Sequence, residues 1–255
     1  MGKRTYQRHV TSKWSKTKVL LSNPATARHV PDTRRLSQGT LQNMLRTYGM
    51  VYVKPNSGTY GIGVIRVERY VSEGKETYTY HAGTKIRTFP AYDELYRSLS
   101  KLVRKRKYLA QKGIHLLKYK GKRFDLRVMV QQSPVGRWES TGVIGRVAAQ
   151  GKAVTNVHNG GKLKPVESLL SAYAGSREKQ RIIKGLRSLG LSVAKQLHGR
   201  YRGLKEVGLD VAMDEKLFPW ILEVNTSPDP FIFRKLKDKS VFRRVYRYAK
   251  AYGRL

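Results

Sequence analysis

Apolar residues recur at helical spacing in four stretches of the chain. The longest stretch, residues 176–200, sets Ile182, Leu186, Leu189 and Val193 three or four positions apart, so they share one face of a helix. Shorter helices of the same kind are predicted over residues 36–48, 91–107 and 241–255.

Runs of alternating or continuous apolar residues predict two groups of strands. The first group covers residues 50–55, 64–70 and 76–83, with a short strand or connector at 108–114. The second group covers residues 124–132, 138–150, 208–214 and 220–225. Residues 1–30 and 153–166 lack such patterns and are predicted to be loops. Because helices are interspersed with antiparallel pairs, without regular βαβ alternation, the order predicts an α+β fold.

The predicted elements divide into two lobes behind a basic leading segment. We expect this segment over residues 1–35, an N-terminal lobe over 36–112 and a C-terminal lobe over 113–255. The chain has no cysteine, which excludes disulfides, thiolate metal sites and a cysteine nucleophile, and favours a cytoplasmic location. No apolar run is long enough to predict a membrane span.

Charge narrows the choice of partners. The chain carries 52 Lys+Arg against 17 Asp+Glu, a formal net charge of +35. A field of that sign concentrates anions, so nucleic acid, an acidic peptide or polymer, a nucleotide or an anionic surface are the candidate partners. A solvated basic surface that serves only solubility is the plain alternative.

A glycine-rich turn follows the first predicted strand. Gly58, Gly61 and Gly63 are spaced so that backbone N–H groups can approach phosphate oxygens, and Lys54 stands just before them. The turn is neither a Walker loop, because no Gly-Lys-Ser/Thr follows, nor a dinucleotide fingerprint, because a strand and not a helix comes next. A nucleotide-covering hairpin loop fits this arrangement, and an ordinary hairpin rich in glycine is the alternative.

Two carboxylates and an amide stand in the last pair of predicted strands. Asp210 lies in the apolar run GLDVAMD, and Glu223 and Asn225 lie two positions apart in WILEVN. Residues i and i+2 of a strand face the same side, so a paired strand can bring Asp210 beside the other two. Oxygen donors of this kind suit Mg²⁺, which fills its remaining positions with waters and phosphates. Salt bridges to neighbouring Lys or Arg are the alternative.

Further candidates for an anion site lie between these motifs. Arg127 and Arg146 are flanked by apolar residues in predicted strands, and arginine forks match phosphate and carboxylate oxygens. A purely structural or surface role is the alternative for each. The polar loop 155–161 contains Asn156 and His158, and it suits the edge of a phosphate site.

The chain resembles the ATP-grasp superfamily of ligases. The resemblance lies in the order and spacing of Lys54 with SGTYGIG, FDLRVMV, GRVA, TNVHNGG and LGLDVAMD followed by WILEVNTSP. The longer segments VYVKPNSGTYGIGVIRV and FDLRVMVQ resemble the YheC/YheD-type endospore coat-associated proteins, and this resemblance covers roughly residues 30–235. The resemblance implies two α+β lobes that clasp Mg-ATP, and an association with spores.

The resemblance also implies roles for individual residues. Lys54 would contact the ATP phosphates, with Gly58, Thr59, Tyr60, Gly61 and Gly63 closing over them and Gln111 meeting the adenine. Mg²⁺ would be held by Asp210, Glu223 and Asn225. The catalytic residues beside the transferred phosphoryl group would be Arg127, Arg146 and Asn156.

The implied reaction is a carboxylate–amine ligation that converts ATP to ADP and phosphate through an acyl phosphate, and the charge favours an acidic peptide or other anionic substrate. Such a step needs positioning and charge neutralisation more than a protein nucleophile. Two alternatives stay open, a kinase-like transfer and a weakly catalytic or non-catalytic protein of this fold that binds nucleic acid or a spore component. The formation of a homo-oligomer is also left open.

One departure from the family concerns the start of the chain. Members usually carry an α/β domain before the two lobes, and here it is expected to be truncated. A second lysine usual upstream of the glycine loop has no clear equivalent, and Lys18 and Arg28 are the candidates to replace it.

Overall fold

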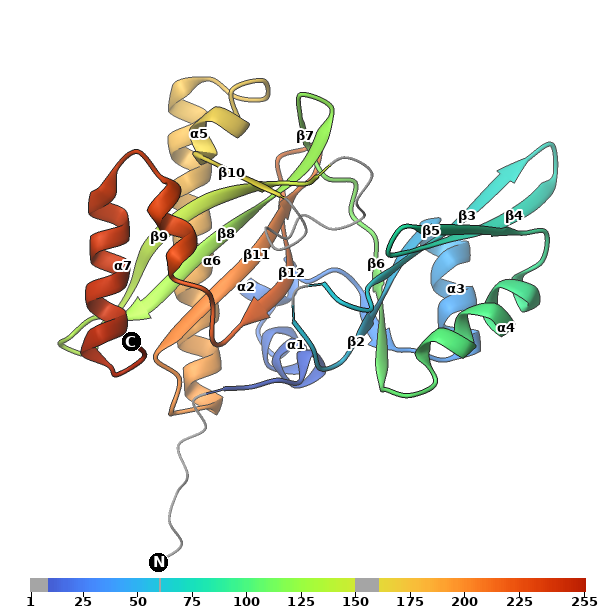
Figure 1. Ribbon diagram of the computed structural model, residues 1–255, viewed down its shortest axis with the longest axis horizontal. Coiled ribbons are helices and arrows are strands. Elements are labelled where there is room, and N and C mark those ends of the chain that lie inside the picture. The colour runs from blue at the N-terminus through green and yellow to red at the C-terminus, as the bar shows by residue number, and fades with distance from the viewer. Residues whose placement is uncertain (1–8, 60, 150–160) are drawn as a thin grey trace, which may run out of the picture.

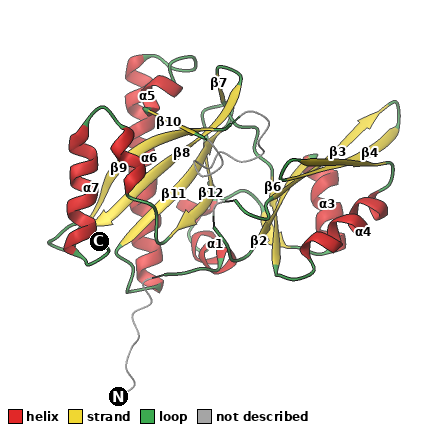
Figure 2. Ribbon diagram, viewed as in Figure 1, coloured by secondary structure: helices red, strands yellow, loops and turns green. Residues whose placement is uncertain are grey.

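Two antiparallel sheets, each with its own helices, make up the protein (Figure 1). The computed structural model describes residues 9–59, 61–149 and 161–255. The sheets stand side by side and are joined near the middle of the molecule, as Figure 2 shows. The predicted α+β class is therefore confirmed.

The N-terminal sheet has six strands in the order β1-β6-β2-β3-β4-β5. Its strands are β1 (Thr33–Arg35), β2 (Met50–Pro55), β3 (Ile65–Ser72), β4 (Lys75–Ala82), β5 (Lys85–Phe89) and β6 (Tyr108–Lys112). Helices α3 (Gln38–Tyr48) and α4 (Tyr92–Val103) pack on this sheet. Their apolar sides, with Leu41, Leu45, Leu95 and Leu99, share one core with Val51 of the sheet.

The C-terminal sheet runs in the order β10-β9-β8-β11-β12, with β7 paired to β8. Its strands are β7 (Lys118–Tyr119), β8 (Lys122–Gln132), β9 (Trp138–Val147), β10 (Lys162–Lys164), β11 (Glu206–Met213) and β12 (Pro219–Asn225). Its helical segments are α5 (Val166–Leu169), α6 (Ser176–Arg200), the 3-10 turn η2 (Phe231–Lys235) and α7 (Lys239–Ala251).

Helices cover both faces of this sheet, and the alternation of side chains explains how. Val128 and Val130 of β8 belong to a core with α6, whereas Met129, between them, belongs to a separate core with Phe233 and Val245 of η2 and α7. Arg127 and Asp125 of β8 lie on the same face of the sheet as Met129, which is the face that α7 covers. Polar residues on that face therefore lie beyond the cover of α7, where the other lobe approaches.

The described part of the leading segment, which begins at residue 9, contains two helices, contrary to the loop predicted for residues 1–30. It forms α1 (Lys13–Leu21) and α2 (Pro24–Ala27). Ser12 caps α1 by accepting a hydrogen bond from the Ser15 amide, and α1 packs against α6 and β12 of the C-terminal sheet. The segment belongs to both lobes, since β1 pairs with β6 of the N-terminal sheet.

Four strands were not predicted from the sequence: β1, β5, β7 and β10. β5 forms an exposed edge of the N-terminal sheet, and the three-residue β10 lies within the stretch 153–166 that was expected to be a loop. β6 ends at Lys112, but the division into residues 1–35, 36–112 and 113–255 stays a prediction. Among the described residues, no helix is both long and apolar enough to span a membrane.

Candidate active site

A cleft with an empty volume of about 790 Å³ lies where the two lobes meet. The N-terminal lobe contributes β2, β6 and the glycine-rich turn between β2 and β3, and the C-terminal lobe contributes β8, β9, β11 and β12. The predicted residues that line this cleft are Lys54, Gly58, Thr59, Gly61, Gln111, Arg146, Asp210 and Glu223. Residues from seven separate parts of the chain are thus brought to one place.

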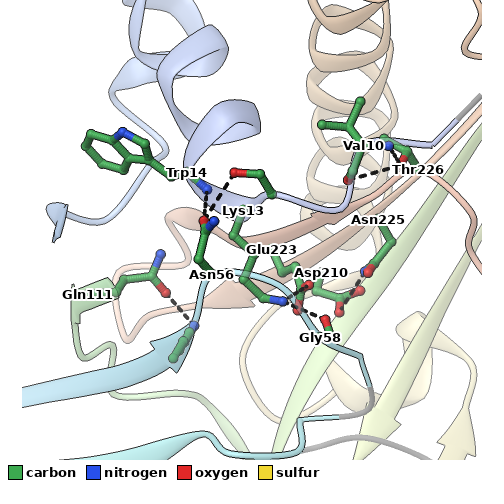
Figure 3. A network of polar contacts seen from close by, with 12 residues as sticks. Val10, Lys13, Trp14, Asn56, Gly58, Gln111, Asp210, Glu223, Asn225 and Thr226 are labelled. Carbon is green, nitrogen blue, oxygen red and sulfur yellow. Dashed lines mark hydrogen bonds and ion pairs between the residues drawn. The ribbon is translucent and has the colours of Figure 1, made fainter. Parts of the chain in front are cut away.

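Strand pairing assembles the predicted metal-binding set. Asp210 of β11 stands opposite Glu223 of β12, and Gly208 stands opposite Asn225. A bulge follows between Asp210 and Val211. The Asn225 amide nitrogen lies 3.4 Å from Oδ2 of Asp210, and Figure 3 shows the three side chains converging.

Both arginines predicted for catalysis hold Asp210. Arg127 Nε donates to Oδ1 at 2.6 Å, and Arg146 Nη2 lies 3.0 Å from Oδ2. Burial disfavours the ionised form of Asp210, but the two guanidinium groups outweigh it and lower the pKa of Asp210 to about 2. Asp210 is therefore a carboxylate at every physiological pH.

Asp125 is a functional candidate that the sequence did not reveal. It is 2% exposed and accepts two hydrogen bonds from Arg146, from Nε at 2.8 Å and from Nη2 at 2.6 Å. Burial alone would disfavour the guanidinium, yet Asp125 and Asp210 together raise the pKa of Arg146. The pairing depends on β8 and β9 being in register, with Asp125 opposite Arg146.

The leading segment supplies a lysine that was also missed. Lys13 Nζ lies 3.0 Å from Oε1 of Glu223 and donates to the carbonyl oxygen of Gly58 at 2.8 Å. Figure 3 shows this side chain reaching between the glycine-rich turn and β12. The two substitutes considered for the second lysine do not line the cleft, since Lys18 is exposed and Arg28 lies over the ring of Phe218.

Lys54 projects into the cleft from the N-terminal sheet. Its Nζ donates to Oε1 of Gln111 at 2.5 Å, and Gln111 Nε2 donates to Thr33 Oγ1 at 3.0 Å. Burial lowers the pKa of Lys54 to about 8, and the positive charge of Lys13 acts in the same direction. Gln111, expected to meet adenine, thus accepts a hydrogen bond from Lys54, the lysine predicted to contact the phosphates.

The glycine-rich turn needs glycine for its backbone shape. Gly61 and Gly63 have φ of +72° and +78°, a region that other residues rarely adopt. A Cβ on Gly63 would also lie 3.0 Å from the hydroxyl of Tyr108. Of the predicted nucleotide-contacting residues, Tyr60 lies outside the described residues.

A second hollow, with an empty volume of about 1,040 Å³, continues from the cleft. The two share Thr59, Arg146, Asp210 and Glu223. The remaining walls come from Arg127, Asn225, the segment 227–232, Arg254 and Leu255. Asn156 and His158, predicted at this edge, lie outside the described residues.

The donor set suits a magnesium ion. The described residues contain no cluster of three His, Cys, Asp or Glu that would form a complete protein cage. Mg²⁺ does not require one, because it binds through one or two carboxylates and completes its shell with waters and substrate phosphates. Asp210, Glu223 and Asn225 supply such a set beside a cationic cleft, so the residues present fit the ion. The salt bridges foreseen as the alternative are also present, and they balance the carboxylates in the protein alone.

Comparison with known proteins identifies relatives of this arrangement. The family described as YheC/D-like ATP-grasp matches residues 2–255. The chain is 26% identical over 247 residues to the endospore coat-associated protein YheD of Bacillus subtilis (strain 168), covering 93% of this chain and 53% of YheD. It therefore spans about half the length of that relative.

Solved structures show the same fold at low sequence identity. The D-cycloserine synthetase DcsG superposes with a TM-score of 0.57 at 11% identity, covering 95% of this chain and 70% of DcsG. The D-alanine-D-alanine ligase from Coxiella burnetii superposes with a TM-score of 0.53 at 13% identity, covering 96% and 58%. At such identities the likeness concerns the fold alone.

Proposed function

The chain belongs to the YheC/D-like ATP-grasp family, and from that membership and the cleft we propose that it is an ATP-dependent carboxylate–amine ligase. The fold is that of enzymes that form C–N bonds, such as D-alanine-D-alanine ligase. The observation that carries the proposal is the meeting of Asp210, Glu223 and Asn225 with Lys13, Lys54 and the glycine-rich turn around one cleft.

Cationic side chains outnumber carboxylates around Asp210 and Glu223, which favours a bound nucleotide. Four cationic side chains, from Lys13, Lys54, Arg127 and Arg146, face three carboxylates. We propose that Asp210, Glu223 and Asn225 would hold Mg²⁺, which would screen phosphate charge there. Lys13 and Lys54 then turn toward the phosphates, and the glycine-rich turn covers them.

In the proposed reaction a substrate carboxylate oxygen attacks the γ-phosphorus of ATP. The bond between the γ-phosphorus and the β–γ bridging oxygen breaks, which gives ADP and an acyl phosphate. An amine nitrogen then attacks the acyl carbon, phosphate leaves, and the amine proton passes to solvent. Arg127 and Arg146, anchored on Asp210, point a fixed positive charge at the transferred group, and fixed charge lowers the barrier because it needs no reorganisation.

We propose that the second hollow binds the carboxylate substrate. It opens from the cleft beside Arg127 and Arg146, which places a substrate next to the γ-phosphate position. The net charge of +35 favours an acidic peptide or another anionic substrate, and Arg254, which lines this hollow and is ion-paired with Glu206, adds to the positive lining. A cytoplasmic, spore-associated location is part of the same proposal, on the strength of the likeness to YheD.

Calorimetry with a non-hydrolysable ATP analogue tests the site. We expect binding that requires Mg²⁺ in the wild type and is lost in Glu223→Gln, while Glu215→Gln, on an exposed turn, binds normally. Incubation with a substrate carboxylate labelled with ¹⁸O tests the chemistry, because an acyl phosphate transfers one ¹⁸O to inorganic phosphate once the amine attacks. ADP formation with the phosphoryl group retained on the carboxylate would support the kinase-like alternative instead, and release of unlabelled phosphate would indicate hydrolysis of ATP by water.

A further inference from the structure

We propose that the protein binds single-stranded nucleic acid in a basic groove outside the nucleotide cleft. The groove lies between α1, β1, β6 and the end of α4, and its empty volume is about 1,150 Å³. Its walls include Trp14, Lys18, Arg35, Tyr96, Arg106 and Lys107. We call this hollow the outer groove.

The outer groove is separate from the ligase site. It shares no lining residue with the cleft or with the second hollow. Consecutive residues of α1 line the two sites. Lys13 lines the cleft and contacts Gly58 and Glu223, whereas the ring of Trp14 lines the outer groove and points away from them (Figure 3). The groove therefore calls for a ligand of its own.

The charges of the outer groove are uncompensated. Lys18, Arg35, Arg106 and Lys107 are exposed, and within the described residues none of them makes an ion pair with an acidic side chain. No Asp or Glu is among the groove's lining residues. In the cleft and the second hollow, by contrast, Lys13, Arg127 and Arg146 are all paired with carboxylates. Four unpaired cations along one hollow suit a chain of phosphates.

The aromatic residues indicate which polyanion fits. Trp14 and Tyr96 are half-buried in the groove, and the guanidinium of Arg35 lies 6.0 Å from the centre of the Trp14 ring. A cationic groove with aromatic side chains is the arrangement by which proteins bind single strands, because bases stack on the rings while phosphates follow the cations. An acidic polypeptide would use the cations alone and leave the ring of Trp14 without a role, whereas the ring of Tyr96 also packs on Tyr92 of α4.

Fluorescence anisotropy with a labelled oligothymidylate of about 12 nucleotides tests the proposal. The first variant replaces the four groove cations with glutamine: Lys18, Arg35, Arg106 and Lys107. The matched control replaces four exposed cations on or beside α6 and α7: Arg177, Lys184, Lys237 and Arg243. Each variant loses four charges, so both fall from +35 to +31 and differ only in where the charge is lost.

We expect the groove variant to bind at least about tenfold more weakly and the slope of log K against log salt to fall by about 2 to 3, as loss of four phosphate contacts on a single strand requires. The control variant should bind nearly as the wild type does. Trp14→Ala should weaken binding about tenfold, and Trp14→Phe should retain most of the affinity, because a ring is kept.

Three outcomes would overturn the assignment. Equal losses in the groove and control variants would mean that binding is spread over the basic surface. Displacement of the oligonucleotide by polyglutamate of equal charge as readily as by unlabelled oligothymidylate would assign the groove to acidic polypeptides. Unchanged binding in Trp14→Ala would exclude stacking. Binding of the Mg-ATP analogue, measured in parallel, reports on the ligase site, so failure of one proposal is distinguishable from failure of the other.

Discussion

The guanidinium of Arg146 holds two carboxylates at once, deep in the C-terminal sheet. It is 4% exposed and reaches Asp125 on one side and Asp210 on the other, while Arg127 takes the second oxygen of Asp210. Buried charges are tolerated only when each has a partner. The four side chains therefore form one unit, in which the loss of any member leaves a charge without compensation.

Neutralising Asp125 tests how tightly this unit is coupled. We expect Asp125→Asn to lower the free energy of unfolding by about 3 kcal/mol, because Arg146 would keep only Asp210 as a buried partner. Urea denaturation measures the change. Glu215→Gln, at an exposed turn, serves as the control and should leave the unfolding midpoint unchanged. A loss in Asp125→Asn no larger than in the control would mean that Asp125 does not compensate Arg146.

Lys54 should make nucleotide binding depend on pH. Its pKa is lowered to about 8 by burial, so in the free protein the amine loses its proton as the pH rises through that value. Phosphates favour the charged amine and raise its pKa, so binding near pH 8 takes up a proton and affinity falls at higher pH. Calorimetry in two buffers of different ionisation enthalpy measures this uptake.

Two variants assign the proton. Lys54→Arg should abolish the uptake while keeping a positive charge. Lys16, whose pKa burial also lowers to about 8, is the competing source. Uptake that persists in Lys54→Arg and disappears in Lys16→Gln would assign the proton to Lys16 and contradict the role given to Lys54.

The sequence reveals some of these residues and hides others for physical reasons. Asp210 and Glu223 are conspicuous because acids are scarce and both stand in apolar runs. Lys13 is one of 52 cationic residues, and only the path of α1 brings it to Glu223. Asp125 is recognisable as the partner of Arg146 only from the register of β8 with β9, and no local sequence pattern encodes that register.

At the scale of elements, the predictions succeeded where a pattern is long and failed where it is short. The predicted helix 176–200 coincides with α6, whose apolar stripe covers one face of the sheet. α1 has nine residues with little segregation of apolar from polar side chains, so its cap and its packing on α6 stabilise it more than its pattern does. The exposed strand β5 has no buried face to produce an alternating pattern.

Two glycines of α6 provide an internally controlled test of its packing. A Cβ on Gly190 would lie 2.9 Å from methyl groups of Val128 and Val130, whereas a Cβ on Gly185 would meet nothing within 4 Å. We expect Gly190→Ala to destabilise the protein by roughly 1–3 kcal/mol through overpacking, and Gly185→Ala to stabilise it by up to about 1 kcal/mol through helix propensity. Urea denaturation distinguishes the two, and equal effects would mean that α6 lies farther from β8 than the structure has it.

At the scale of the whole molecule, the leading segment joins the two lobes. The Val10 amide donates to Thr226 Oγ1 at 2.9 Å in the C-terminal lobe, and the Trp14 amide donates to Asn56 Oδ1 at 2.9 Å beside the glycine-rich turn (Figure 3). Between them, Lys13 bridges the Gly58 carbonyl and Glu223. The glycine-rich turn and β12, the strand proposed to contribute to the magnesium site, thus contact the same lysine, so a ligand that engages Lys13 would affect how the two lobes are held together.

Exchanging that cation for a neutral side chain of similar length tests the link. In Lys13→Met we expect affinity for the Mg-ATP analogue to fall about tenfold or more, because a charge-assisted contact to phosphate is lost together with the bridge that holds the turn. Lys18→Met removes the same charge from the same helix at an exposed position outside the cleft, so nucleotide affinity should be unchanged. A larger loss in Lys18→Met than in Lys13→Met, measured by calorimetry, would show that Lys18 and not Lys13 contacts the nucleotide. The leading segment would then adopt a different path over the cleft when ATP is bound.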